Sequence, residues 1–231
     1  MRTYARVAGA LYLVIIVCAG FSEGFVRSSL IVPGDAAATA GNILESPGLF
    51  RLGFAGDLIA FLADAAVAVL LYVLLKPVSQ TMSLLAAAFR LLAHPAIAAV
   101  NLLNHFGVLL ILGGSEYLTA FQPEQLNAMA MLSLETHRYG YLIGGAFFGV
   151  HCGLLAYLVI KSRLFPSVLG VLLYAASFGY LTESFAFFLF PSLEALASSL
   201  VVVTAGIAEV SLCLWLLVKG VREAPGELAA G

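Results

Sequence analysis

Charged residues are scarce in this 231-residue chain: they make up 10% of it, whereas 62% of the residues are hydrophobic and the mean hydropathy is +1.03. Soluble globular domains carry about 25% charged residues and roughly 45–50% apolar ones. The composition therefore excludes a water-soluble enzyme. Eleven Lys and Arg residues against thirteen Asp and Glu residues also exclude an electrostatic nucleic-acid partner. A polytopic membrane protein remains, with the lipid bilayer as its surroundings.

Cysteine is rare as well, and the three cysteines, Cys18, Cys152 and Cys213, all fall within apolar stretches. This excludes an extracytoplasmic disulfide framework. The sequence contains no HExxH, HxxxH or paired-cysteine motif, which are typical metal-ligand spacings. No metal and no cofactor is therefore predicted. The composition leaves zinc or haem open, with His94 and His151 as the candidate metal ligands.

Long apolar runs, in contrast, are abundant. A helix needs about 20 mostly apolar residues to cross the hydrocarbon core of a bilayer. Six stretches meet this length, and they predict an all-α fold: one transmembrane domain over residues 1–231, built as a bundle of six helices. The expected spans are approximately 7–25, 54–75, 84–112, 141–160, 166–190 and 196–218.

Cationic residues predict the orientation of these spans, because Lys and Arg near span ends are retained on the cytoplasmic side. One set of span ends carries Arg2, Arg6, Lys76, Lys161, Arg163, Lys219 and Arg222. The opposite set carries only Arg27, Arg51 and Arg138. Both termini are therefore expected to be cytoplasmic. Glu23 and Arg27 follow the first apolar run where a signal peptide would have small residues, so we expect this helix to be retained.

The two outer connections, 26–53 and 113–140, are long enough to contain short extra helices. In the first connection, Asp35 is placed to cap a short helix that Pro47 ends. In the second, Pro123 opens a partly apolar stretch, which predicts an interfacial helix leading into the fourth span.

The third span carries a stripe of polar residues. At about 100° per residue, five side chains project from one face of this helix. These are Arg90, His94, Asn101, Asn104 and His105. Pro95 lies among them and is expected to kink the helix, because it cannot donate a hydrogen bond to the preceding turn.

Carboxylates lie within the spans too. Asp57 and Asp64 are seven residues apart on one face of the second span, Glu183 lies in the fifth span and Glu209 in the sixth. Counted from the span ends, Asp64, His94, His151 and Glu209 lie near the midplane. Glu23, Asp57, Asn101, Glu183 and the remaining histidines, His105 and His137, lie nearer the outer boundary.

The charge balance within the spans bears on the protonation state of these acids. Five acids within the spans face Arg90 as the one intramembrane arginine, so we expect at least one of them to carry a proton or hold a cation. The residues expected to bind a ligand, proton or cation are Asp57, Asp64, Arg90, His94, Asn101, His151, Glu183 and Glu209. No catalytic residue is assigned.

Several motifs together resemble a known family. They include FSEGFVRSSLIVPGDAAATAGNI near the start, AAFRLL with NLLN in the third span, and HRYGY with FFGVH in the fourth. These segments, with KSRLFPSVLGVLL, resemble the bacterial integral-membrane family called domain of unknown function 4386. The resemblance implies a protein of the bacterial cytoplasmic membrane. It implies no activity and no catalytic residue.

Three functions are compatible with these residues. We favour a non-enzymatic one, in which a polar intramembrane cavity binds or moves a small solute, a proton or a cation. Six spans are few for a transporter, so a homo-oligomer is one expectation. The second function is a structural or partner-subunit role without chemistry. The third is an intramembrane metal-dependent hydrolase, since histidine and carboxylate ligands can activate water.

Overall fold

The computed structural model describes residues 1–222, and the end of the expected domain, 223–231, lies outside the described residues. Six helices are long and apolar enough to cross a membrane, which confirms the all-α prediction at this level. The α-helices are α1 (Arg2–Phe21), α2 (Ser28–Leu30), α3 (Ala36–Glu45), α4 (Pro47–Leu75), α5 (Gln80–Leu91), α6 (Ala99–Leu112), α7 (Pro123–Ser162), α8 (Ser167–Leu189) and α9 (Glu194–Val218). Two π-helical segments, Ser22–Arg27 and Leu92–Ala98, join α1 to α2 and α5 to α6, so each pair forms one long helix.

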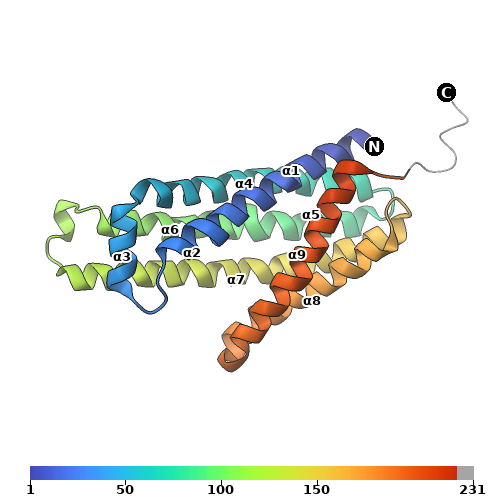
Figure 1. Cartoon of the computed structure of the whole chain (residues 1–231). Coiled ribbons are helices and arrows are strands. Elements are labelled where there is room, and N and C mark those ends of the chain that lie inside the picture. Colours follow the sequence, from blue (N-terminus) through green and yellow to red (C-terminus); the bar gives the residue numbers. More distant parts are fainter. Residues whose placement is uncertain (223–231) are drawn as a thin grey trace, which may run out of the picture.

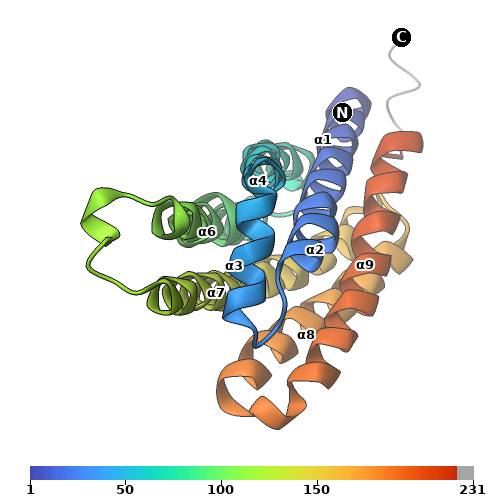
Figure 2. The ribbon, with the colours of Figure 1, turned by 60° about the vertical axis from the view of Figure 1, so that its left-hand side comes forward.

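The long helices form one bundle with α7 at its centre, packed against α5, α6 and α8. Helices α4, α6 and α7 run along its length, α1 packs against α4 and α9, and α8 and α9 lie at an angle to α7 (Figure 1). The start of α1 and the end of α9 lie at the same end of the bundle (Figures 1 and 2). We call this the terminal end and the opposite end, where α3 lies across the bundle, the distal end.

The surface of the bundle is apolar, and its largely apolar interior also contains charged and polar side chains. Large apolar side chains point outward, such as Leu103 at 71% exposure and Val202 at 72%. Arg90, Asp57 and His105 are completely buried instead. This distribution suits a lipid surrounding, in which charged groups turn to the bundle interior.

The two outer connections differ from each other. The short helix predicted after Asp35 is present as α3, and the Asp35 side chain accepts a hydrogen bond from the Ala38 amide at 2.9 Å. The helix predicted to begin at Pro123 is present, but it is not a short extra helix, because it continues without a break into the fourth span as the 40-residue helix α7. No proline interrupts the stretch after Pro123, and Gln122 caps its start. At 1.5 Å per residue α7 is about 60 Å long, about twice the hydrocarbon thickness.

Pro95 lies inside the π-helical segment Leu92–Ala98. Proline removes one donor from the helical ladder, and the wider π turn accommodates this locally. The expected distortion of the third span is therefore present as a π segment. The same type of turn occurs in the first long helix at Ser22–Arg27, without a proline.

The two largest apolar cores lie at different levels of the bundle. The larger one includes Tyr12, Leu74, Leu155 and Leu212 and draws on all six long helices. A second, smaller core lies toward the distal end and includes Val26, Ile43, Phe50, Val108 and Leu134. The helix ends at the distal end are therefore packed as a unit around α3.

A glycine allows the closest approach of α1 and α9. A Cβ atom at Gly9 would lie 2.6 Å from the backbone nitrogen of Leu217. Gly20, on the same helix, has no atom within 4 Å of its Cβ position. Small residues at such crossings let helices in membranes pack closely.

We predict that Gly9→Ala destabilises the purified protein by about 1–3 kcal/mol, because the added methyl group forces the α1 and α9 backbones apart. Thermal unfolding in detergent measures this as a lower Tm. Gly20→Ala is the matched control and should keep or slightly raise the Tm, since alanine favours helix over glycine. Equal Tm values for Gly9→Ala and the unchanged protein would contradict the packing.

Candidate functional site

All six long helices contribute polar side chains to one cluster within the bundle. We call it the central cluster; its members are Tyr12 of α1, Asp64 of α4, Arg90 of α5, His94 of the Leu92–Ala98 segment, His151 of α7, Tyr180 of α8 and Glu209 of α9. The midplane residues expected from the sequence, Asp64, His94, His151 and Glu209, are all among them.

Arg90 connects the members of the central cluster. Its Nη2 donates to Asp64 Oδ1 at 2.6 Å, and its Nη1 donates to His151 Nε2 at 3.1 Å. The guanidinium also lies over the rings of Tyr12, at 4.8 Å, and Phe148, at 5.1 Å. A buried arginine is tolerated when charge, hydrogen bonds and aromatic faces compensate for its lost hydration. Arg90 receives all three.

His151 is held in one tautomer. Its Nδ1 lies 2.8 Å from the carbonyl oxygen of Ala86, which can only accept a hydrogen bond. The proton is therefore on Nδ1, and the lone pair of Nε2 accepts from Arg90. In this arrangement His151 has no free lone pair for a metal, so it and His94 do not form an open metal site here.

His94 is the more accessible histidine of the central cluster. Its Nδ1 lies 3.3 Å from Asp64 Oδ2, its ring contacts those of Phe61 and Phe148, and 22% of its side chain is exposed. A carboxylate oxygen accepts, so Nδ1 donates to Asp64 and Nε2 carries the lone pair.

Glu209 is held by hydroxyl groups. Tyr180 donates to Oε1 at 2.5 Å and Tyr12 donates to Oε2 at 3.3 Å. Among residues 1–222 no lysine, arginine or histidine forms an ion pair with Glu209. Its carboxyl group therefore has hydrogen-bond donors but no direct ion pair, whereas Asp64 is paired with Arg90.

A second polar group lies toward the distal end. We call it the distal cluster; its members are Arg27, Asp57, Asn101, His105 and His137. Arg27 donates from Nη1 to Asp57 Oδ2 at 2.7 Å and from Nε to Glu23 Oε2 at 2.6 Å. Arg27, which the sequence assigns to the outer boundary, is only 6% exposed and is paired inside the bundle.

Asn101 and His137 join α6 to α7. The Asn101 Nδ2 donates to the His137 carbonyl at 2.6 Å, and the His137 Nδ1 donates to the Asn101 carbonyl at 3.0 Å. Gly140 makes room for this contact, because a Cβ there would overlap the Asn101 amide. Asn104 donates to Asn101 Oδ1 at 2.9 Å and extends the contact.

The eight residues that the sequence predicts as binding residues lie in two clusters and at one separate position. Five of them lie in the central cluster: Asp64, Arg90, His94, His151 and Glu209. Asp57 and Asn101 lie in the distal cluster. Glu183 lies in neither, and it accepts a hydrogen bond from Ser198 at 2.8 Å between α8 and α9.

Sequence reasoning missed three partners, Tyr12, Tyr180 and Arg27. A tyrosine in an apolar run gives no sign of where its hydroxyl points. Arg27 did have a signal, because Glu23 precedes it by four residues, the spacing of an ion pair on one helix face.

Comparison with known proteins identifies the family of this chain. A family model described as "Domain of unknown function (DUF4386)" matches residues 7–220. The chain belongs to this family. This DUF4386 chain is 32% identical over 165 residues to an "Uncharacterized protein" from Archaeoglobus fulgidus, a match that covers 71% of the chain and 82% of the relative. No solved structure matches it. The resemblance drawn from the motifs is confirmed, and this DUF4386 chain is a multi-pass membrane protein.

The buried ion pair between Arg90 and Asp64 can be tested by mutation. We predict that Asp64→Asn lowers the free energy of unfolding by about 3–5 kcal/mol, because it leaves the charge of Arg90 buried without a counter-charge. The apolar double variant Asp64→Leu/Arg90→Met should regain most of this loss. Chemical or thermal unfolding in detergent measures both.

The control is Glu23→Gln, which changes the 72% exposed partner of Arg27. Exposed ion pairs contribute about 0–1 kcal/mol, so this variant should be close to the unchanged protein. If Asp64→Asn were no less stable than Glu23→Gln, the pairing of Asp64 with Arg90 would be contradicted.

Proposed function

We propose that this protein binds or moves a small solute or cation across the membrane in step with a proton, and that the central cluster is the protonation site. The observation that carries the proposal is the environment of Glu209, a carboxyl group held by two tyrosine hydroxyls and not joined to Arg90 by a direct ion pair. Such a group can exchange a proton or a cation without breaking an ion pair.

The neighbouring groups support this role. His94 is partly exposed and contacts Asp64, while Arg90 lies between Asp64 and Tyr12. Two groups that can exchange a proton, His94 and Glu209, therefore flank a fixed ion pair. Intramembrane carboxylates and histidines in such chains are typical of proton relays.

A small cavity of about 10 Å³ lies between α4, α5 and α7 and reaches His151, and this volume is near the minimum for one water molecule. Its lining is mostly apolar and includes neither His94 nor Glu209. A larger solute would require the helices around this cavity to separate.

We propose the orientation with both termini in the cytoplasm, in a bacterial cytoplasmic membrane. The seven cations at the terminal end are all exposed, whereas Arg27 at the distal end is buried and paired. Arg51 and Arg138 are then the exposed cations of the opposite set. Burial of Arg27 thus increases the bias on which the positive-inside argument depends. We also propose that the protein acts as a homo-oligomer.

A structural role is the second candidate, and the Asn101–His137 contact favours it. Reciprocal hydrogen bonds between α6 and α7 stabilise packing without performing chemistry. This candidate predicts that variants of the central cluster lose stability but change no proton movement.

Proteoliposomes containing a pH-sensitive dye test the proposal. Under an imposed membrane potential, the unchanged protein should carry protons faster than protein-free vesicles, and Glu209→Gln should lower the rate at least about tenfold, because a positioned proton-transfer group is removed. Equal rates for the unchanged protein and protein-free vesicles would overturn proton-linked movement.

Two tyrosines on α8 provide the matched control. Tyr180→Phe removes a hydroxyl from Glu209, whereas Tyr174→Phe changes an exposed residue of the same helix. Tyr180→Phe should slow proton movement and Tyr174→Phe should not. Equal effects would argue for general destabilisation, which the Tm of each variant measures.

A further inference from the structure

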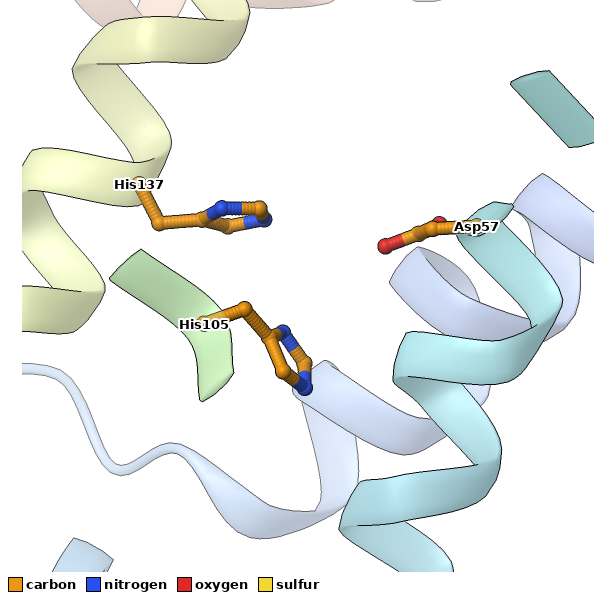
Figure 3. A group of neighbouring side chains, drawn as sticks. All are labelled: Asp57, His105 and His137. Carbon is orange, nitrogen blue, oxygen red and sulfur yellow. The ribbon is translucent and has the colours of Figure 1, made fainter. Parts of the chain in front are cut away.

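Three side chains of the distal end point toward one another from three different helices. They are Asp57 of α4, His105 of α6 and His137 of α7 (Figure 3). One ligand atom from each lies within 4.8 Å of the others. All three residues are buried, with exposures of 0%, 0% and 3%. We call them the distal triad.

Each residue of the distal triad has a buried polar atom without a partner. Five buried side-chain nitrogen or oxygen atoms lack a hydrogen bond among residues 1–222, and three belong to the triad: Asp57 Oδ1, His105 Nδ1 and His137 Nε2. A buried polar group without a partner is costly. Three such atoms on neighbouring side chains indicate a common missing partner.

The tautomers show what kind of partner this is. His137 donates from Nδ1 to the Asn101 carbonyl, and His105 donates from Nε2 to the Phe50 carbonyl at 3.3 Å. Carbonyl oxygens only accept, so the protons are on these nitrogens. The unpartnered nitrogens therefore carry lone pairs, and the third atom is a carboxylate oxygen. Three acceptors cannot satisfy one another.

The backbone contacts also resemble the supporting shell of a metal site. A histidine that binds a metal almost always donates its other ring N–H to a carbonyl, carboxylate or water, which fixes the ring. Both histidines of the triad do so, and Phe50 additionally stacks on His105 at 4.1 Å. In contrast, the lone pair of His151 in the central cluster is occupied by Arg90.

We propose that the distal triad binds a divalent transition-metal ion such as zinc through two imidazole nitrogens and one carboxylate oxygen. Imidazole ligands suit zinc, copper, iron and nickel, and three protein ligands leave a coordination position open. With bonds of about 2.0–2.1 Å, tetrahedral ligand atoms lie about 3.3 Å apart. The triad therefore closes by up to about 1.5 Å on binding.

The charge around the triad favours a cation. Arg27 contributes one positive charge, and Asp57 and Glu23, both paired with it, contribute two negative ones. The ionised group has a formal charge of −1 before metal binding. The second carboxylate oxygen of Asp57 stays bound to Arg27, which leaves Oδ1 directed to the metal.

The distal triad lies toward the distal end, away from the central cluster. Asp57 precedes Asp64 by seven residues, His105 follows His94 by eleven and His137 precedes His151 by fourteen, which corresponds to about 11, 17 and 21 Å along the helices. With the central cluster at the midplane, these spacings bracket the roughly 15 Å half-thickness of the hydrocarbon core and put the triad near its outer boundary. Ions in the water at the distal end can reach this depth without crossing the bilayer.

The experiment uses the full chain purified without a histidine tag, equilibrated with zinc chloride and freed of excess metal. Elemental analysis should find about one zinc per chain, and X-ray absorption should show imidazole nitrogen in the first shell at about 2.0–2.1 Å. Less than about 0.2 zinc per chain, or a shell without imidazole, would overturn the proposal.

Variants locate the metal. His105→Gln and His137→Gln should each weaken zinc binding at least about tenfold, whereas the matched control His94→Gln should bind like the unchanged protein. Circular dichroism and size-exclusion chromatography verify folding. Equal loss in His94→Gln, or no loss in either triad variant, would overturn the assignment. If a triad variant does not fold, the X-ray absorption of the unchanged protein still decides.

Discussion

The arrangement of the bundle depends on the compensation of one buried charge, that of Arg90. A guanidinium removed from water requires a counter-charge and hydrogen-bond acceptors, and here the counter-charge comes from α4, an acceptor from α7 and aromatic faces from α1 and α7. These contacts restrict rotation and sliding of the three helices around α5. The charge that is costly in lipid thereby specifies how the helices pack.

The two polar clusters share one arrangement, in which an aspartate of α4 pairs with a buried arginine. Asp57 and Asp64, two turns apart, each pair with a buried arginine, and each arginine lies near an aromatic ring: Tyr141 for Arg27, and Tyr12 for Arg90. What differs is the role of the histidines. In the central cluster Arg90 donates to the lone pair of His151, whereas in the distal cluster the lone pairs of His105 and His137 have no donor. The two free lone pairs suit the distal cluster, and not His151, to a metal.

Hydropathy predicts the long helices of the fold, but it does not show how long each helix is or which polar residues are paired. Long apolar runs identified the six long helices, and periodicity identified Arg90, His94 and Asn101 as inward-facing residues. The length of α7 was missed because the polar residues around His137 are typical of a loop. Among them, His137 is buried in the bundle, whereas Thr136 and Arg138 are exposed on the same continuous helix. Arg27 was assigned to the boundary because sequence position does not show whether an arginine is paired.

Metal binding at the distal triad would also explain a feature of the distal end that packing alone does not require. A helix end outside the hydrocarbon core could expose its polar side chains to water at little cost. Here α3 and the small core around Ile43 and Phe50 cover the distal end, and His105 and His137 remain buried there with unpartnered lone pairs. Shielding from water removes the hydration of these histidine nitrogens. It also strengthens their interaction with a cation, because electrostatic attraction increases as the local dielectric falls. The cover and the free lone pairs are therefore consistent parts of one binding site.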